Sequence, residues 1–104
     1  MKSYLALFAA LATSCFVSAP AMADAALATA KNCTACHAIE KKVVGPSYKD
    51  VAAKYASQPD AVEKLVGKVM KGGAGAWGPV PMPAMAQVNA DEAKKLVTWI
   101  LTLK

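Results

Sequence analysis

The motif Cys33-Thr34-Ala35-Cys36-His37 limits what this chain can fold into more than any other feature of the sequence. Two cysteines three residues apart, followed at once by a histidine, are typical of covalent haem attachment. On one helical turn the two sulfurs can reach the two vinyl groups of one porphyrin. His37 then lies beneath the ring and can offer Nε2 to the iron. The motif therefore predicts one haem c, bound by thioether bonds at Cys33 and Cys36.

Two other uses of these residues fit the sequence less well. A thioredoxin-like redox pair needs a βαβ arrangement, and no strands are indicated around residue 33. A structural zinc site needs a second pair of cysteines or histidines. His37 is the only histidine in the chain, so haem attachment is the better interpretation.

The N-terminal segment is typical of a secretory signal peptide. Lys2 supplies a positive charge, residues 4–12 are apolar, and Ala21-Met22-Ala23 is an A-x-A cleavage pattern directly before Asp24. We therefore predict that residues 1–23 are a signal peptide cleaved after Ala23 and that the product is periplasmic.

Two alternatives exist for this segment. A transmembrane anchor requires about 20 strongly apolar residues, and the apolar run is shorter. Lipidation at Cys15 would give an anchored product, but the preceding residues 12–14 match a lipoprotein signal poorly. Cleavage, with a product that is not an integral membrane protein, is the prediction.

Cleavage would leave residues 24–104 as one domain of 81 residues, with the net charge reduced from +5 to +4 by the loss of Lys2. So small a domain usually needs a staple such as a disulfide, a metal or a cofactor. Multidomain enzymes, long coiled coils and repeat arrays are excluded by length. Nucleic-acid binding is not indicated, because no basic tract is interleaved with aromatic residues.

Helical signals dominate the rest of the chain, and the predicted fold class is all-α with about four helices. Asp24 is placed to cap a helix over residues 25–35. Capping pairs open three further helices: Ser47 with Asp50, Asp60 with Glu63, and Asn89 with Glu92. Apolar residues of helical period follow the last two pairs: Val62, Leu65, Val66, Val69 and Met70, then Ala93, Leu96, Val97, Ile100 and Leu101. Residues 72–89 show no periodicity, and no β alternation is evident.

A methionine is the natural sixth ligand of the iron, since there is no second histidine. Met70 lies on a helical apolar stripe and is expected to pack in the core. Met82, stiffened by Pro81 and Pro83, is favoured, and Met85 is a competitor. A histidine and a methionine on one iron favour the ferrous state and raise the potential above that of a bis-histidine site.

The chain resembles the small class I bacterial cytochromes c of the c-551 type from Asn32 to Lys104. The resemblance rests on three segments: Cys33-Thr34-Ala35-Cys36-His37-Ala38-Ile39, Val44-Gly45-Pro46-Ser47-Tyr48-Lys49-Asp50-Val51-Ala52-Ala53-Lys54-Tyr55 and Trp77-Gly78-Pro79-Val80-Pro81-Met82-Pro83. It implies a class I cytochrome c fold wrapped round one haem.

The resemblance also implies roles for individual residues. Met82 would be the axial ligand, and the Pro46 carbonyl would accept the Nδ1 proton of His37. Trp77 would donate its indole N–H to a haem propionate, and Lys68 would contact the same group. In one respect the chain departs from the family pattern, in which a polar amide follows the P-M-P segment. Here Ala84-Met85 stands at that point, with Gln87 and Asn89 further along.

The predicted function is that of a soluble periplasmic one-electron carrier and not of an enzyme. An iron with two protein ligands has no vacant position for a substrate, and the chain supplies no catalytic dyad. The resemblance implies a cytochrome bc complex as donor and a nitrite reductase or terminal oxidase as acceptor, with a monomeric carrier. The alternatives are a haem enzyme or sensor from which Met82 dissociates, and a haem subunit of a larger complex.

A small apolar docking face is expected at the exposed haem edge, with charges around its rim. The residues predicted for its centre are Ala35, Val43, Val44, Pro79 and Pro83, and those for its rim are Lys31, Lys41, Lys42 and Lys49.

Overall fold

A computed structural model describes residues 12–15 and 20–104 of the chain. The predicted apolar run of the signal peptide, residues 4–12, lies almost wholly outside the described residues, while Cys15 is described and exposed. Within the two described ranges, no helix combines the length and the apolar character that crossing a bilayer requires.

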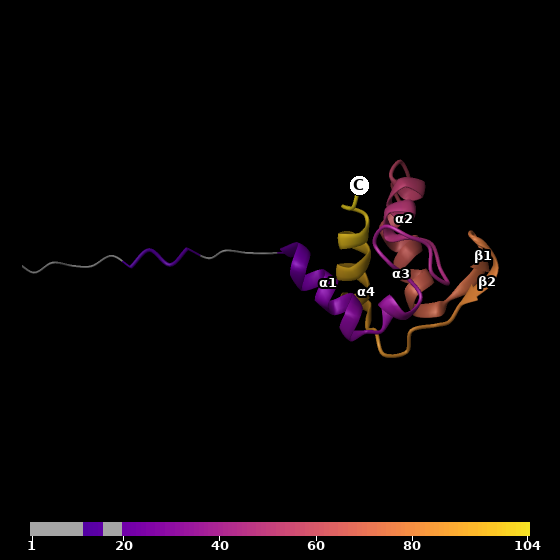
Figure 1. Cartoon of the computed structure of the whole chain (residues 1–104), viewed down its shortest axis with the longest axis horizontal. Helices are drawn as coiled ribbons and strands as arrows, with labels where there is room; N and C mark the ends of the chain where they lie inside the picture. Colours follow the sequence, from indigo (N-terminus) through magenta and orange to yellow (C-terminus); the bar gives the residue numbers. More distant parts are fainter. Residues whose placement is uncertain (1–11, 16–19) are drawn as a thin grey trace, which may run out of the picture.

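Helix α4, Ala90–Ile100, is the centre of the fold (Figure 1). It packs against the other three α-helices of the described residues, which are α1 (Pro20–Ala30), α2 (Tyr48–Tyr55) and α3 (Ala61–Lys71). A short 3-10 helix, η1, covers Cys33–Ala35, and two short strands, β1 (Gly73–Gly75) and β2 (Gly78–Met82), lie between α3 and α4. The mostly helical architecture confirms the predicted fold class.

The first helix differs from the prediction at both ends. It begins at Pro20, so Asp24 is inside the helix instead of capping it, and it ends at Ala30. The break is at Asn32, whose φ of 64° is left-handed, a conformation that asparagine tolerates better than most residues. The chain therefore turns before Cys33 and starts a new helical turn there, and the predicted cleavage point lies within α1.

Two of the three predicted capping pairs make side-chain caps. The Asp50 N–H donates to Ser47 Oγ over 3.1 Å at the start of α2. At the start of α4, the Glu92 N–H donates to Asn89 Oδ1 and the Asn89 N–H donates to Glu92 Oε1, which completes a capping box. These local bonds explain why both helices begin where the sequence predicts.

Two predictions about α3 differ from the structure. Asp60 stands at the N-cap but makes no side-chain cap bond, and its carboxylate pairs with Lys64 at 3.3 Å instead. The expectation that Met70 packs in the core was wrong, because its side chain is 37% exposed. Five residues after the buried Leu65 correspond to about 140° around the helix, which turns Met70 away from α4.

The segment after α3 was predicted to lack regular structure, but it contains the antiparallel pair β1–β2, with Gly73 opposite Met82 and Gly75 opposite Gly78. All but one of the residues in the two strands are exposed, so the pair has no buried face to impose alternation on the sequence. This hairpin carries Met82 at its end.

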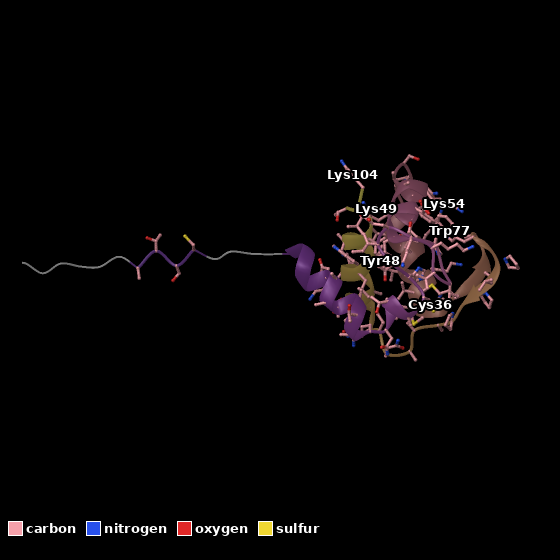
Figure 2. The ribbon with its side chains drawn as sticks, in the orientation of Figure 1. Cys36, Tyr48, Lys49, Lys54, Trp77 and Lys104 are labelled. Carbon is pink, nitrogen blue, oxygen red and sulfur yellow. The ribbon has the colours of Figure 1, made fainter. Side chains whose placement is uncertain are left out.

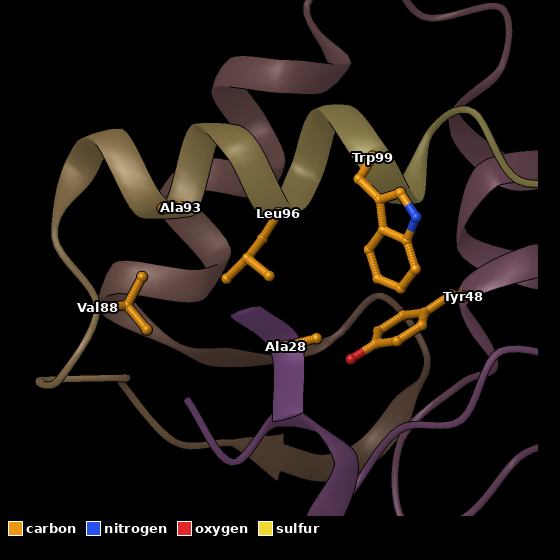
Figure 3. Packing of buried hydrophobic residues seen from close by; sticks show 6 residues of the cluster. All are labelled: Ala28, Tyr48, Val88, Ala93, Leu96 and Trp99. Atoms are coloured by element: carbon orange, nitrogen blue, oxygen red, sulfur yellow. The ribbon is translucent and has the colours of Figure 1, made fainter. Parts of the chain in front are cut away.

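The buried apolar residues form two clusters. The first cluster joins α1, α2 and α4 (Figure 3) and contains Ala28, Tyr48, Val88, Ala93, Leu96 and Trp99. Within it the rings of Tyr48 and Trp99 meet edge to face, with centroids 5.5 Å apart. The second cluster consists of Val51, Leu65 and Val97, one from each of α2, α3 and α4.

Candidate haem site

The C-x-x-C-H motif folds into a single tight turn. The Cys33 carbonyl accepts hydrogen bonds from the Cys36 N–H at 3.2 Å and from the His37 N–H at 3.0 Å. Both sulfurs belong to half-buried residues and neither forms a disulfide. The turn thus keeps two free thiols and the imidazole close together.

The His37 ring is oriented by the loop that returns to it at Pro46, nine residues later. Its Nδ1 lies 2.8 Å from the Pro46 carbonyl oxygen, so the tautomer that donates this hydrogen bond leaves Nε2 with a free lone pair. The Val44 and Gly45 N–H groups both donate to the Cys36 carbonyl, which fixes the loop against the motif.

A cavity of about 230 Å³ opens beside His37. Its lining comes from the residues that directly follow η1, from α2, α3 and α4, and from the β1–β2 hairpin. Every residue of the second cluster lines it, as do Cys36, His37, Lys68, Trp77 and Met82. Figure 2 gives the positions of Cys36 and Trp77 on the ribbon. Cys33 is not part of this lining and packs against the first cluster.

The two methionines that compete as ligands lie in different surroundings. Met82 is partly buried and lines the cavity. Met85 packs against the first cluster, and its N–H donates to the Val69 carbonyl at 3.0 Å. Only Met82 of this pair therefore shares the cavity with His37.

Trp77 and Lys68, which the family resemblance assigns to a propionate, both line the cavity. The indole of Trp77 is 44% exposed, and the Lys54 ammonium lies 4.4 Å from the centroid of its ring. Lys54 Nζ also donates to the Ala76 carbonyl. Lys54 thereby ties the hairpin to α2, and no local pattern indicates this contact because its partners are 22 residues apart.

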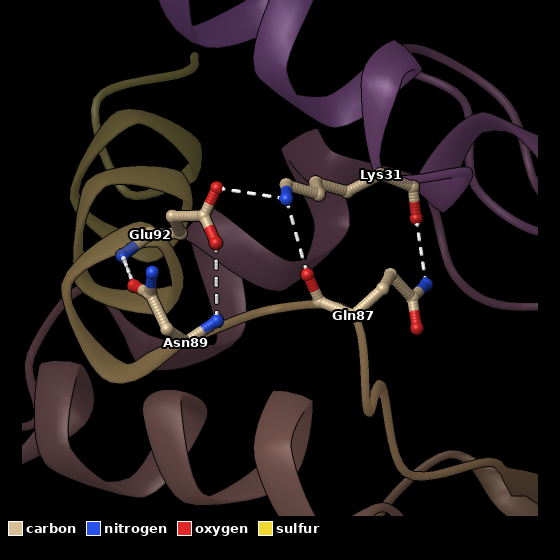
Figure 4. Close-up of polar contacts among 4 residues, drawn as sticks. All are labelled: Lys31, Gln87, Asn89 and Glu92. Carbon is tan, nitrogen blue, oxygen red and sulfur yellow. Dashed lines mark hydrogen bonds and ion pairs between the residues drawn. The ribbon is translucent and has the colours of Figure 1, made fainter.

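A second polar link holds the segment that follows Met82 (Figure 4). Lys31 Nζ donates to the Gln87 carbonyl at 3.1 Å, and Gln87 Nε2 donates back to the Lys31 carbonyl at 2.9 Å. Lys31 also pairs with Glu92 at 2.9 Å. Sequence reasoning missed this link because its partners are 56 residues apart.

Burial affects two ionisable groups of the site. It raises the pKa of the Cys33 thiol, and it raises the pKa of Tyr48, with the nearby Cys33 sulfur as a further cause. Both groups are therefore neutral near pH 7, and a neutral thiol at Cys33 suits a residue that packs against an apolar cluster.

The residues present fit a haem. Val51, Leu65 and Val97 give one flank of the cavity an apolar wall suited to a porphyrin face, and Lys68 with the Trp77 indole supplies donors for its carboxylate edge. His37 and Met82 supply an imidazole nitrogen and a thioether sulfur. Cys36 borders the same cavity, and Cys33 belongs to the same hydrogen-bonded turn as Cys36.

Comparison with known proteins agrees with this fit. The cytochrome c family model matches residues 22–104. The chain is 51% identical to cytochrome c-552 of Nitrosomonas europaea over 98% of this chain and 97% of the relative. It is 47% identical to cytochrome c-551 of Pseudomonas aeruginosa over the full length of both.

Solved structures give the same result. The crystal structure of Nitrosomonas europaea cytochrome c552 superposes with a TM-score of 0.75 at 54% identity, covering 77% of this chain and 99% of that one. The class 1 cytochrome MtoD of Sideroxydans lithotrophicus superposes with a TM-score of 0.66 at 35% identity, covering 79% and 94%.

The fold and the site define a class I cytochrome c, and the chain belongs to the cytochrome c family. Its close relatives are cytochromes of the c-551 and c-552 type. The chain carries one covalently bound haem c, held by the motif at Cys33, Cys36 and His37, and it is an electron carrier and not an enzyme.

Proposed function

We propose that the protein is a periplasmic carrier that moves single electrons from a membrane donor complex, such as a cytochrome bc complex, to a nitrite reductase or terminal oxidase, with His37 and Met82 as the axial ligands of its iron. The observation that supports this most is that both side chains line one cavity although they lie 45 residues apart in sequence. The haem supplies the one-electron chemistry between its ferrous and ferric states.

The protein's residues have distinct tasks in this proposal. The Pro46 carbonyl fixes the His37 tautomer and makes its Nε2 more basic. With a haem bound, Met82 would supply its thioether sulfur to the iron and leave no site for a substrate. Trp77 and Lys68 hold the propionate edge as hydrogen-bond donors.

Substitution of the two methionines tests the ligand assignment. Met82→Ala should abolish the weak far-red sulfur–iron band of the ferric protein and open the iron to cyanide. Met85→Leu is the matched control and should keep the band, because Met85 packs in the first cluster. Loss of the band in Met85→Leu, with retention in Met82→Ala, would transfer the ligand to Met85.

The docking face is proposed to lie where apolar side chains are exposed beside the cavity. Val43, Val44 and Val80 are 46%, 51% and 62% exposed, and Ala35, Pro79 and Pro83 are exposed as well. Of the four lysines expected at the rim, Lys31 pairs with Glu92 and Lys49 pairs with Glu40. Lys41 and Lys42 are exposed and are the stronger candidates for steering.

Steering by these lysines predicts that the second-order rate with an acidic partner falls as salt rises. Replacing Lys41 and Lys42 by Gln should flatten this dependence and leave the optical spectrum unchanged. Lys94→Gln together with Lys95→Gln, both exposed on α4, removes the same two charges as a control. An equal effect from the control would mean that net charge alone sets the rate.

The proposed location depends on removal of residues 1–23. The mass of the haem protein recovered from the periplasm should equal that of residues 24–104 plus one haem. A lipid-bearing product that begins at Cys15 would instead support anchoring, and an uncleaved chain would refute the cleavage.

A further inference from the structure

Three separate contacts enclose the His37 ring, and only one of them is a hydrogen bond. The Pro46 carbonyl holds Nδ1. The Tyr48 ring lies against the imidazole, with centroids 5.4 Å apart and planes inclined by 22°. Gly45 borders the Cε1 edge, where an added Cβ would overlap Cε1 and stand 2.9 Å from Nδ1.

Each contact restrains a different motion of the imidazole. A hydrogen bond at Nδ1 fixes the direction of one atom but still permits the ring to swing about the line from Nδ1 to the carbonyl. An offset-stacked aromatic face resists that swing, because tilting the imidazole forces it into the neighbouring ring. Gly45 lies so close to the Cε1 edge that any side chain at this position would overlap the imidazole.

Tyr48 is itself held rigidly. It is 4% exposed, and its ring also meets the ring of Trp99 edge to face, with centroids 5.5 Å apart. Its N–H donates to the Ala38 carbonyl at 2.9 Å, so the backbone of Tyr48 is tied to the residue that follows His37. Figure 3 shows the Tyr48 ring facing the indole of Trp99 within the first cluster.

The hydroxyl of Tyr48 is not the group that contacts the imidazole of His37. It is buried beside the Cys33 sulfur and makes no hydrogen bond to His37. The part of Tyr48 that contacts His37 is the flat ring, which also contacts the indole of Trp99.

We propose that Tyr48 is a positioning residue for the haem iron: its ring face, working against Gly45, sets the plane of the His37 imidazole about the iron–nitrogen axis. The inference rests on the proposed function in taking His37 as an axial ligand. The angle of that plane decides how the imidazole π orbital mixes with the iron d orbitals. It therefore controls the distribution of unpaired spin over the ferric haem, which is the state that accepts the electron.

Proton NMR of the ferric holoprotein tests the proposal, because the hyperfine shifts of the four haem methyl groups depend on the orientation of the axial ligands, the imidazole plane among them. Tyr48→Phe keeps the ring and should retain the wild-type shift pattern. Tyr48→Leu removes the flat face and should change the order or the spread of the four resonances. Should it yield too little holoprotein, Tyr48→Met removes the flat face with less loss of volume.

Two further variants separate positioning from general loss of packing. Leu96→Ala empties the same first cluster without touching His37, so it should lower the unfolding midpoint and leave the methyl pattern unchanged. Gly45→Ala pushes the imidazole from its other border and should change the pattern although Tyr48 is intact.

The outcomes distinguish this inference from the proposed function. If the wild-type protein shows no hyperfine-shifted His37 ring protons, His37 is not a ligand and the proposed function fails. If those protons are shifted as expected, an unchanged methyl pattern in Tyr48→Leu overturns this inference alone. A change in Leu96→Ala as large as that in Tyr48→Leu overturns it as well.

Discussion

Replacement by alanine is expected to have opposite effects at two glycines, one inside α3 and one at its C-cap. Gly67 lies inside the helix, and a Cβ added there would have no atom within 4 Å. Gly72 ends the helix with φ of 69° and ψ of −164°, a conformation open essentially to glycine alone. Its N–H donates to the Lys68 carbonyl at 2.8 Å.

The structure gives the size of each effect. Gly67→Ala should stabilise the protein by about 0.5–1 kcal/mol, because alanine loses less backbone entropy in a helix. In Gly72→Ala a Cβ would overlap the Met82 carbonyl oxygen and lie 2.8 Å from the Ala84 nitrogen. The forced backbone costs about 1–3 kcal/mol and the displacement of the Met82 segment about as much again. This total is a large fraction of the stability of a small domain.

Guanidinium denaturation of the two ferric holoproteins, followed by circular dichroism and by the far-red sulfur–iron band, measures both effects. Gly67→Ala should raise the midpoint and keep the band. Gly72→Ala should lower the midpoint and weaken or shift the band before global unfolding, because the clash is with Met82, the residue proposed to carry the ligand sulfur. A Gly72→Ala protein with the wild-type midpoint and an unaltered band would refute the reasoning.

Three further outcomes are expected. Asn89→Ala should cost about 1 kcal/mol in urea denaturation, because it removes the side-chain acceptor at the start of α4; a neutral result would mean that the cap does not limit stability. Leu96→Ala should cost about 2–5 kcal/mol, because the side chain is 2% exposed, and a loss near zero would show that the core collapses to fill the space. Lys31 holds the pKa of the Glu92 carboxyl below its ordinary value of 4.5, so the stabilisation by Glu92 is present above that pH and is lost as the pH falls through the lowered pKa. Glu92→Gln should therefore be less stable than wild type at neutral pH and equal to it in acid, and a difference that persists in acid would rule out charge as the cause.

The features that could be predicted from sequence are those decided by neighbours in the chain. The caps at Ser47 and Asn89 each depend on a residue three positions later, and both formed. The turn at Cys33 depends on the motif itself. Local chemistry was sufficient in these cases because the partners are close in sequence whatever the rest of the fold does.

The features that could not be predicted depend on where distant segments meet. Gln87 bonds Lys31 only because α1 and the segment before α4 pack together, and neither residue has a local signature for it. Met70 has the spacing of a buried stripe, but the position of α4 leaves it exposed. The β1–β2 hairpin escaped detection because its strands have no buried face, and therefore no alternation.

The side chains of the second cluster contact one another and also face the cavity, so the chain alone does not complete their packing. Val51, Leu65 and Val97 all border the cavity, so the contacts that would complete their packing come from the porphyrin and not from the chain. Without the haem, part of the apolar burial that favours the packing of α2, α3 and α4 is missing. The chain without haem is therefore expected to be less stable than the holoprotein. Since a less stable chain opens more often, it is also expected to be cleaved faster by proteases before the haem is attached.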